Sequence, residues 1–276
     1  MFPQREALIR LLRDDDPQTV NLVKEQLASN GPEALSQLQD LLRTDDERVT
    51  AHVSDVIRGI VLQQSMDTFQ AFCKRFPKDG DVELGCWLLA KALIPGFDPE
   101  PFKLKLDTWG RQLAMNISHA VSDRERVQQL AQFMSGQLGF RGNVDDYYNP
   151  RNSLIPTVIE TRFGIPISLT ALYMFVSARA GMAVEGVNMP GHFIGRHGDV
   201  IFDPFHRGKI LSVDDCEEIL GRQGIQLEAQ HVTPATSKGI LTRMLANLLY
   251  VYESRQETAL RERVLIWLAA LERPAR

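Results

Sequence analysis

Residues 166–180 are the stretch of this sequence that most constrains its fold. They are apolar nearly all the way round a helical wheel, and a helix without a polar face is buried in the middle of a domain. Pro166 suits the first helical turn, where its missing N–H has no partner to lose, and Gly181 is a typical C-terminal stop. The sequence therefore predicts one central buried helix on which the other elements pack.

After this helix the sequence predicts three short strands, at residues 183–188, 192–196 and 199–205. If His197 and Gly198 form a two-residue hairpin loop, His192 lies directly opposite Asp203, with Cβ atoms roughly 5 Å apart. A loop one residue later still keeps both on one face, as diagonal neighbours. A three-residue loop would place them on opposite faces.

Composition excludes several classes of protein. The net charge is −4, and the Lys and Arg residues are scattered, so we expect neither nucleic acid nor a membrane as a partner. The start of the sequence lacks the pattern of an export signal. Three widely spaced cysteines, Cys73, Cys86 and Cys216, fit neither a disulfide framework nor a zinc motif. These features favour a soluble protein of the reducing cytoplasm.

The pattern of residues 5–60 predicts short amphipathic helices with an internal repeat. The segment 11–16 recurs as 41–46, an offset of 30 residues, and both copies end in acids that can cap the next helix. This pattern resembles HEAT-type repeats, although a plain helical bundle would produce it too. We therefore expect three parts, namely a helical HEAT-like region, an α+β domain and a C-terminal helix pair, at residues 1–81, 82–234 and 235–276.

Three side chains could form a catalytic triad. Ser168 lies in the first turn of the buried helix, and His192 and Asp203 lie on neighbouring strands. A hydroxyl, an imidazole and a carboxylate from separate elements are what a nucleophilic hydrolase or acyl-transferase needs. The alternative for Ser168 is that its hydroxyl satisfies backbone groups at the helix start. The alternative for His192 and Asp203 is a purely structural hydrogen bond.

Five further residues are candidates for ligand binding. Tyr147 and Tyr148 lie in a loop rich in Gly and Asn, which could form the wall of a cleft. Asn152 could line the same cleft or cap a helix that runs to residue 162. Phe205 and His206 follow Asp203 closely in the sequence.

Several motifs in succession resemble the transglutaminase-like superfamily, in its bacterial SirB-type branch. They are G-F-R-G-N-V-D-D-Y-Y-N-P-R-N-S-L, G-I-P-I-S-L-T-A-L-Y, N-M-P-G-H-F and D-P-F, and the resemblance covers about Val82 to Arg276. It implies a papain-like α+β fold, a Cys–His–Asp triad and a tetratricopeptide-like helical tail. His192 and Asp203 match the last two triad members. Where the family has its cysteine, this chain reads Pro166-Ile167-Ser168.

The missing cysteine leaves three hypotheses. The one we favour is a degenerate enzyme that acts as a protein-interaction or scaffold protein, with a protein partner and no cofactor or metal. The alternative is an acyl-transferase or protease-like hydrolase that uses Ser168, His192 and Asp203. In a third, His192, Asp203 and His206 bind a metal. The sequence does not define the direction of His206, and three ligands are few for a metal site.

Overall fold

The computed structural model describes residues 5–272 and divides into two compact units. One unit comprises the described residues up to 69 together with 91–97, and the other comprises 70–90 and the described residues from 98 onward. Helices α4 and α5 each contribute residues to both units. The boundaries expected at 81 and 234 remain predictions.

The smaller unit is helical. Its elements are α1 (Arg5–Leu12), α2 (Pro17–Ser29), the 3-10 helix η1 (Gly31–Ala34), α3 (Leu35–Leu41) and the first part of α4 (Glu47–Arg75). Asp16 caps α2 by accepting hydrogen bonds from two backbone N–H groups, and Asp46 accepts the N–H of Val49 at 3.1 Å in the first turn of α4. The repeated acids thus perform the same task in both copies. A HEAT-type assignment remains a prediction.

The larger unit is mostly helical with small sheets. Its helices are α5 (Val82–Leu93), α6 (Glu100–Ile117), α7 (Asp123–Ala131), η2 (Gln132–Gln137), η3 (Pro150–Ser153), α8 (Ile155–Thr161), α9 (Pro166–Arg179), α10 (Val213–Gly221), η4 (Ala229–Val232), α11 (Ser237–Ser254) and α12 (Thr258–Glu272). No helix within residues 5–272 is both long and apolar enough to cross a membrane.

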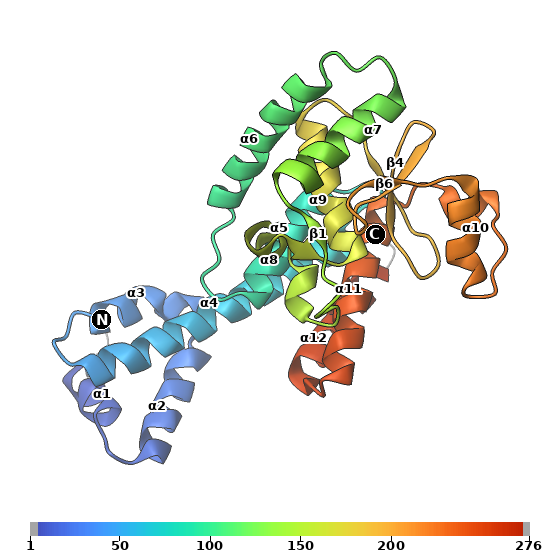
Figure 1. Ribbon diagram of the computed structural model, residues 1–276. Helices are drawn as coiled ribbons and strands as arrows, with labels where there is room; N and C mark the ends of the chain where they lie inside the picture. The colour runs from blue at the N-terminus through green and yellow to red at the C-terminus, as the bar shows by residue number, and fades with distance from the viewer. Residues whose placement is uncertain (1–4, 273–276) are drawn as a thin grey trace. The chain divides into compact units, whose positions relative to one another are not determined.

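Helix α9 is the central buried helix that the sequence predicts. Eleven of its fourteen residues are buried, and it packs against α6, α8, α11 and the strands β3 and β4 (Figure 1). Its C-terminal end is anchored by Arg179, whose guanidinium binds Glu83 through two nitrogens at 2.7 and 2.8 Å. The Nε of Arg179 also donates to Asp107 at 2.6 Å. These ion pairs fix the helix that positions the candidate site.

The main sheet is a four-stranded antiparallel meander. Its strands, in spatial order, are β3 (Glu185–Val187), β4 (Ile194–His197), β5 (Val200–Asp203) and β6 (Lys209–Ile210). A second, parallel pair joins β1 (Arg141–Gly142) to β2 (Phe163–Gly164). Together, the buried helix and the antiparallel sheet are consistent with an α+β core of the transglutaminase-like type.

The hairpin between β4 and β5 has its loop one residue later than our first prediction. Gly195 pairs with Phe202 and His197 pairs with Val200, so the loop consists of Gly198 and Asp199. The physical reason is the left-handed backbone of the first loop residue, φ 55° at Gly198, which glycine adopts without strain. His192 and Asp203 are therefore diagonal neighbours in this register, as expected for a loop one residue later, although His192 itself precedes the strand.

The strand predicted at residues 192–196 also begins later, at Ile194. The residues before it form a turn in which the N–H of His192 donates to the carbonyl of Met189 at 2.9 Å. His192 therefore projects from a turn at the end of the sheet where β4 begins and β5 ends, and we call this end the sheet edge. Thr170 of α9 ties this edge to the central helix, because its hydroxyl donates to the carbonyl of Phe193 at 3.3 Å.

Candidate functional site

Two histidines share one oxygen of Asp203. Nε2 of His192 and Nδ1 of His206 each lie 2.6 Å from Oδ2 of Asp203. The side chain of Asp203 is almost fully buried and that of His192 nearly so, whereas the side chain of His206 is 64% exposed. The structure thus brings together three of the residues that the sequence singled out.

The turn after β5 fixes the orientation of Asp203. Its Oδ1 accepts the backbone N–H groups of Phe205 at 2.9 Å and His206 at 3.3 Å. Burial alone would raise the pKa of Asp203, but the hydrogen bonds from His192 and His206 outweigh it and hold that pKa below its usual range. The carboxylate is therefore ionised near neutral pH, and both rings donate N–H to it.

His192 is positioned by the glycine that precedes it. Gly191 has a φ of 70°, and a Cβ there would collide with the side chain of Gln223. Gln223 in turn donates to the carbonyl of Pro190 at 3.0 Å. The left-handed backbone is what favours glycine at this turn, because the end of the flexible Gln223 side chain could move away from a Cβ. Nδ1 of His192 has no hydrogen-bond partner among the described residues.

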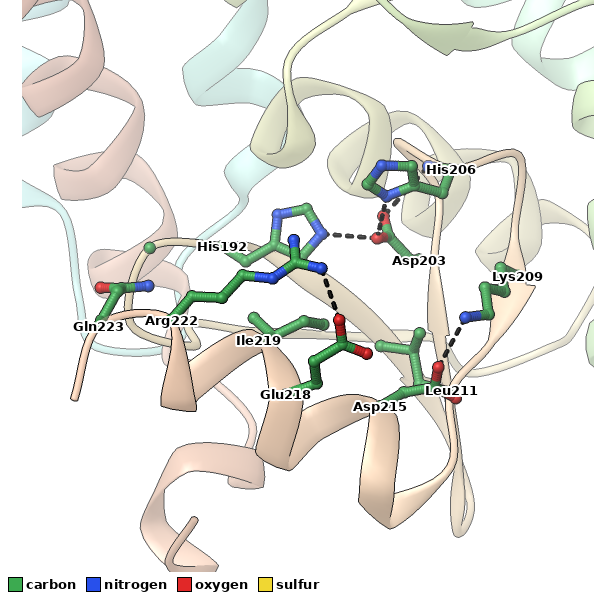
Figure 2. A pocket seen from close by; sticks show the side chains of 11 residues that line it. His192, Asp203, His206, Lys209, Leu211, Asp215, Glu218, Ile219, Arg222 and Gln223 are labelled. Carbon is green, nitrogen blue, oxygen red and sulfur yellow. Dashed lines mark hydrogen bonds and ion pairs between the residues drawn. The ribbon is translucent and has the colours of Figure 1, made fainter. Parts of the chain in front are cut away.

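A pocket of about 390 Å³ opens beside this cluster. Figure 2 shows His192 and His206 converging on Asp203, with α10 forming the facing wall. On that side the charges are paired: Lys209 lies 2.6 Å from Asp215, and Arg222 lies 2.7 Å from Glu218. The pocket is therefore lined by imidazoles, a buried carboxylate and two ion pairs.

Ser168 is fully buried, and its hydroxyl is occupied by backbone groups. Its Oγ donates toward the carbonyls of Asn152 at 2.6 Å and Ile165 at 3.1 Å, and it accepts the N–H of Ile165 at 3.1 Å. No hydrogen bond joins it to His192, and it does not line the pocket. The hydroxyl thus does what the alternative interpretation expected of a first-turn serine.

None of the three thiols is placed to replace it. Cys73, Cys86 and Cys216 are all buried. Burial raises the pKa of Cys73 to about 12 and also raises the pKa of Cys86 and of Cys216. A thiol that acts as a nucleophile needs the opposite, a lowered pKa and some exposure.

Asn152 has a role other than the predicted helix cap. Helix α8 begins at Ile155 after Leu154, and Asn152 lies in the preceding 3-10 helix. Its Nδ2 donates to the carbonyls of Asp146 at 2.7 Å and Tyr147 at 3.1 Å. The side chain therefore fixes the loop that carries the two tyrosines. Asn152 does not line the pocket itself.

Four aromatic side chains form a continuous row that leads to His192. Ring centroids are 5.6 Å apart between Tyr250 and Tyr148, 5.2 Å between Tyr148 and Tyr147, 5.9 Å between Tyr147 and Phe205, and 6.3 Å between Phe205 and His192. Tyr148 and Tyr250 are each 57% exposed. We call Tyr250, Tyr148, Tyr147 and Phe205 the aromatic row.

Sequence reasoning missed Tyr250 and the wall provided by α10. Tyr250 lies in a helix whose apolar spacing indicated only a packed face, so nothing marked its ring as part of a site. Two of the three α10 residues that line the pocket, Asp215 and Glu218, are charged, and a charged helix face is usually only solvated. The sequence contained one signal for this side of the pocket, namely Gly191, beside which the side chain of Gln223 lies.

A helix buried on an antiparallel sheet, with a hydrogen-bonded His and Asp at the sheet edge, is an α+β arrangement consistent with the transglutaminase-like class. A family model described as "Transglutaminase-like superfamily" matches residues 100–246, just over half of the chain. The chain therefore belongs to the transglutaminase-like superfamily.

Several curated proteins are similar in sequence. A UPF0162 protein of Xylella fastidiosa (strain Temecula1) is 32% identical over 178 residues, which cover 60% of this chain and 62% of that protein. A UPF0162 protein of Pseudomonas aeruginosa is 34% identical over 180 residues, 63% of this chain and 66% of that protein. The F-box only protein 21 of Mus musculus is 40% identical over 130 residues, 41% of this chain and 20% of that protein.

These matches cover part of each protein. The aligned region spans about three fifths of the length of the first UPF0162 relative and a fifth of the F-box only protein. No solved structure matches the chain.

Proposed function

We propose that this protein is a non-catalytic member of the transglutaminase-like superfamily that binds a partner protein through the aromatic row and the pocket beside His192. The observation that carries the proposal is the state of the nucleophile position. The Ser168 hydroxyl is buried and bonded to three backbone groups, and every thiol is buried. The His and Asp pair therefore has no nucleophile to activate.

The aromatic row supports a binding role. Exposed tyrosines offer large contact area with a polar tip, and aromatic residues are enriched where proteins bind one another. Asn152 holds the backbone carbonyls of Asp146 and Tyr147, so the loop that carries the two tyrosines is pre-organised. Pre-organised side chains lose less conformational entropy on binding.

Finer assignments belong to the same proposal. We place the chain in the SirB-type branch, with a HEAT-like region at residues 1–81, a tetratricopeptide-like helix pair at residues 235–276, and residence in the cytoplasm. Support comes from the equivalent caps made by Asp16 and Asp46 and from the packing of α11 on α12.

The absence of catalysis is tested with a fluorophosphonate probe, which labels serine nucleophiles. We expect no labelling of the wild type, with an active serine hydrolase treated in parallel as the positive control. The alternative function, a hydrolase or acyl-transferase, draws on the intact hydrogen bond between His192 and Asp203. Labelling that disappears in both Ser168→Ala and His192→Ala would establish that alternative.

Partner binding is tested by site-specific photocrosslinking in the cells that produce the protein. A photoreactive amino acid is placed at Tyr148, and at Leu104 as a matched control, because Leu104 is 66% exposed and lies on α6. We expect a discrete covalent adduct from position 148 only, lost when Phe205 is changed to Ala. Equal adducts from both positions, or none from position 148, would contradict the proposal.

A further inference from the structure

The cluster at the pocket offers three metal-ligand atoms in one place. Nε2 of His192, Oδ2 of Asp203 and Nδ1 of His206 all lie within 4.8 Å of one another. The direction of the His206 side chain was not defined by the sequence, and the structure supplies it: the ring turns back onto Asp203 (Figure 2). Two imidazoles and one carboxylate are a donor set that zinc accepts in sites that keep an open position.

Charge in the pocket favours a cation. Lys209 is paired with Asp215 and Arg222 with Glu218, which leaves Asp203 as the lining acid whose partners are imidazoles. With neutral histidines the lining carries one surplus negative charge. A divalent cation would neutralise that charge at the oxygen that both rings already face.

The atoms can reach metal-binding distances with small movements. Tetrahedral zinc with bonds of about 2.0–2.1 Å needs ligand atoms roughly 3.3 Å apart. The two N···O distances of 2.6 Å would open by less than about 1 Å, and the two ring nitrogens, which lie within 4.8 Å of each other, would close by up to about 1.5 Å. The largely exposed His206 side chain has the freedom to make this adjustment, while Asp203 stays held by the backbone N–H groups at Oδ1.

The proton balance is also satisfied. Each ring now carries its proton on the nitrogen that faces Asp203, and a ligating nitrogen must be free of it. Nδ1 of His192 and Nε2 of His206 have no hydrogen-bond partner among the described residues. Each ring can therefore bind metal as its other tautomer, with the proton on that second nitrogen.

We propose that His192, Asp203 and His206 form a site for a divalent transition-metal ion, with Zn²⁺ the best match to the donors. The three ligands leave a coordination position for water or for a donor atom of a bound molecule in the pocket. This inference goes beyond the proposed function and does not depend on it, because metal binding is measured without any partner.

The experiment is calorimetric titration of the full chain, untagged and freed of metal with a chelator, with zinc chloride. We expect one Zn²⁺ per chain. His206→Ala and His192→Ala should each weaken binding by more than about 100-fold, since loss of an outer-shell partner alone costs 10–100-fold. His119→Ala is the matched control, because His119 is an exposed histidine outside the cluster, and it should bind like the wild type.

Asp203→Asn tests the third ligand in a variant that should still fold. The amide oxygen can still accept the N–H groups of Phe205 and His206, while its nitrogen cannot ligate a metal. It should lose zinc as His206→Ala does. Cobalt(II) provides a second readout, because its visible spectrum reports histidine ligation and should change in the same variants.

Two outcomes would overturn the site. One is sub-stoichiometric zinc uptake by the folded wild type. The other is uptake that persists at wild-type affinity in His206→Ala and His192→Ala, which would place the ion elsewhere, for example at a cysteine. Neither outcome bears on photocrosslinking at position 148, so the failure of one proposal is distinguishable from the failure of the other.

Discussion

The start of α9 and the edge of the sheet were both expected to contribute to one triad, and the structure treats them in opposite ways. At the helix start, Ser168 is fully buried and bonded only to backbone. At the sheet edge, His192 and His206 each keep a ring nitrogen free beside an open pocket. One half of the arrangement supports the fold, and the other half is available to a ligand.

The difference shows that the residue types of a triad do not define its chemistry. Ser168 connects α9 to Asn152, and Asn152 holds the loop of Tyr147, which packs against Phe205 beside His192. The serine therefore supports the loop of the aromatic row and makes no contact with His192 itself. The histidines act by contact.

Asp203→Ala should give the largest effect and is the strongest test of the contrast. It leaves the N–H groups of Phe205 and His206 without an acceptor. Each would cost about 1–3 kcal/mol if fully buried, and both are only partly buried, so we expect a loss of about 2–4 kcal/mol in the free energy of unfolding. Urea denaturation measures it. Asp203→Asn, which keeps one acceptor oxygen, should lose much less. Equal losses in the two variants would contradict the role of Oδ1.

Ser168→Ala should destabilise the protein by about 1–3 kcal/mol, because the N–H of Ile165 loses its buried partner. Zinc affinity should not change. The matched control is Ser177→Ala on the same helix, since the buried Ser177 hydroxyl has no hydrogen-bond partner. That change should cost less or even stabilise. A smaller loss for Ser168→Ala than for Ser177→Ala would show that the bonded hydroxyl is not a support.

His206→Ala should change the free energy of unfolding by less than about 1 kcal/mol, because the His206 side chain is largely exposed and Asp203 keeps His192 and two backbone N–H groups as partners. The same variant should abolish strong zinc binding. Thermal unfolding with and without zinc measures both effects, and only the wild type should gain stability from the metal. A large loss of stability in the absence of zinc would show that His206 supports the fold, as Ser168 does.

The smallest effect concerns the ion pair across the pocket. The Lys209 ammonium, and then the hydrogen bonds from Ser212, lower the pKa of Asp215 from 3.8. A lowered folded-state pKa gives stability that is present above the unfolded pKa and lost as pH falls through the folded one. The melting temperature of the wild type should therefore approach that of Asp215→Asn as the pH falls below about 4. A difference between the two proteins that is constant from pH 6 to pH 2.5 would contradict this.

The sequence predicted the features that depend on local pattern. The all-round apolar composition of residues 166–179 specified the buried helix, because no other environment suits such a face. The predicted proximity of His192 and Asp203 holds although the loop lies one residue later. Such a shift moves the residue that pairs with Asp203 by two positions, and residues two apart in a strand point to the same face of the sheet. These predictions followed from periodicity.

The remaining features depend on contacts between distant parts of the chain. The burial of Ser168 rests on the carbonyl of Asn152, sixteen residues away, which no local pattern reveals. The pocket wall exists because Cys216 and Leu220 of α10 pack on Val187 and Ile194 of the sheet. Tyr250 joins the aromatic row from a helix that follows the whole sheet.

The two oxygens of Asp203 have different partners: Oδ1 accepts hydrogen bonds from the turn, and Oδ2 faces the two imidazoles at the pocket. Mutational drift that silences a reaction would still be opposed at this position by the demands of folding. An acid paired with a histidine here is therefore a poor marker of turnover among related sequences. A better marker to compare is the group that faces Nδ1 of His192, the ring nitrogen that is not bonded to Asp203.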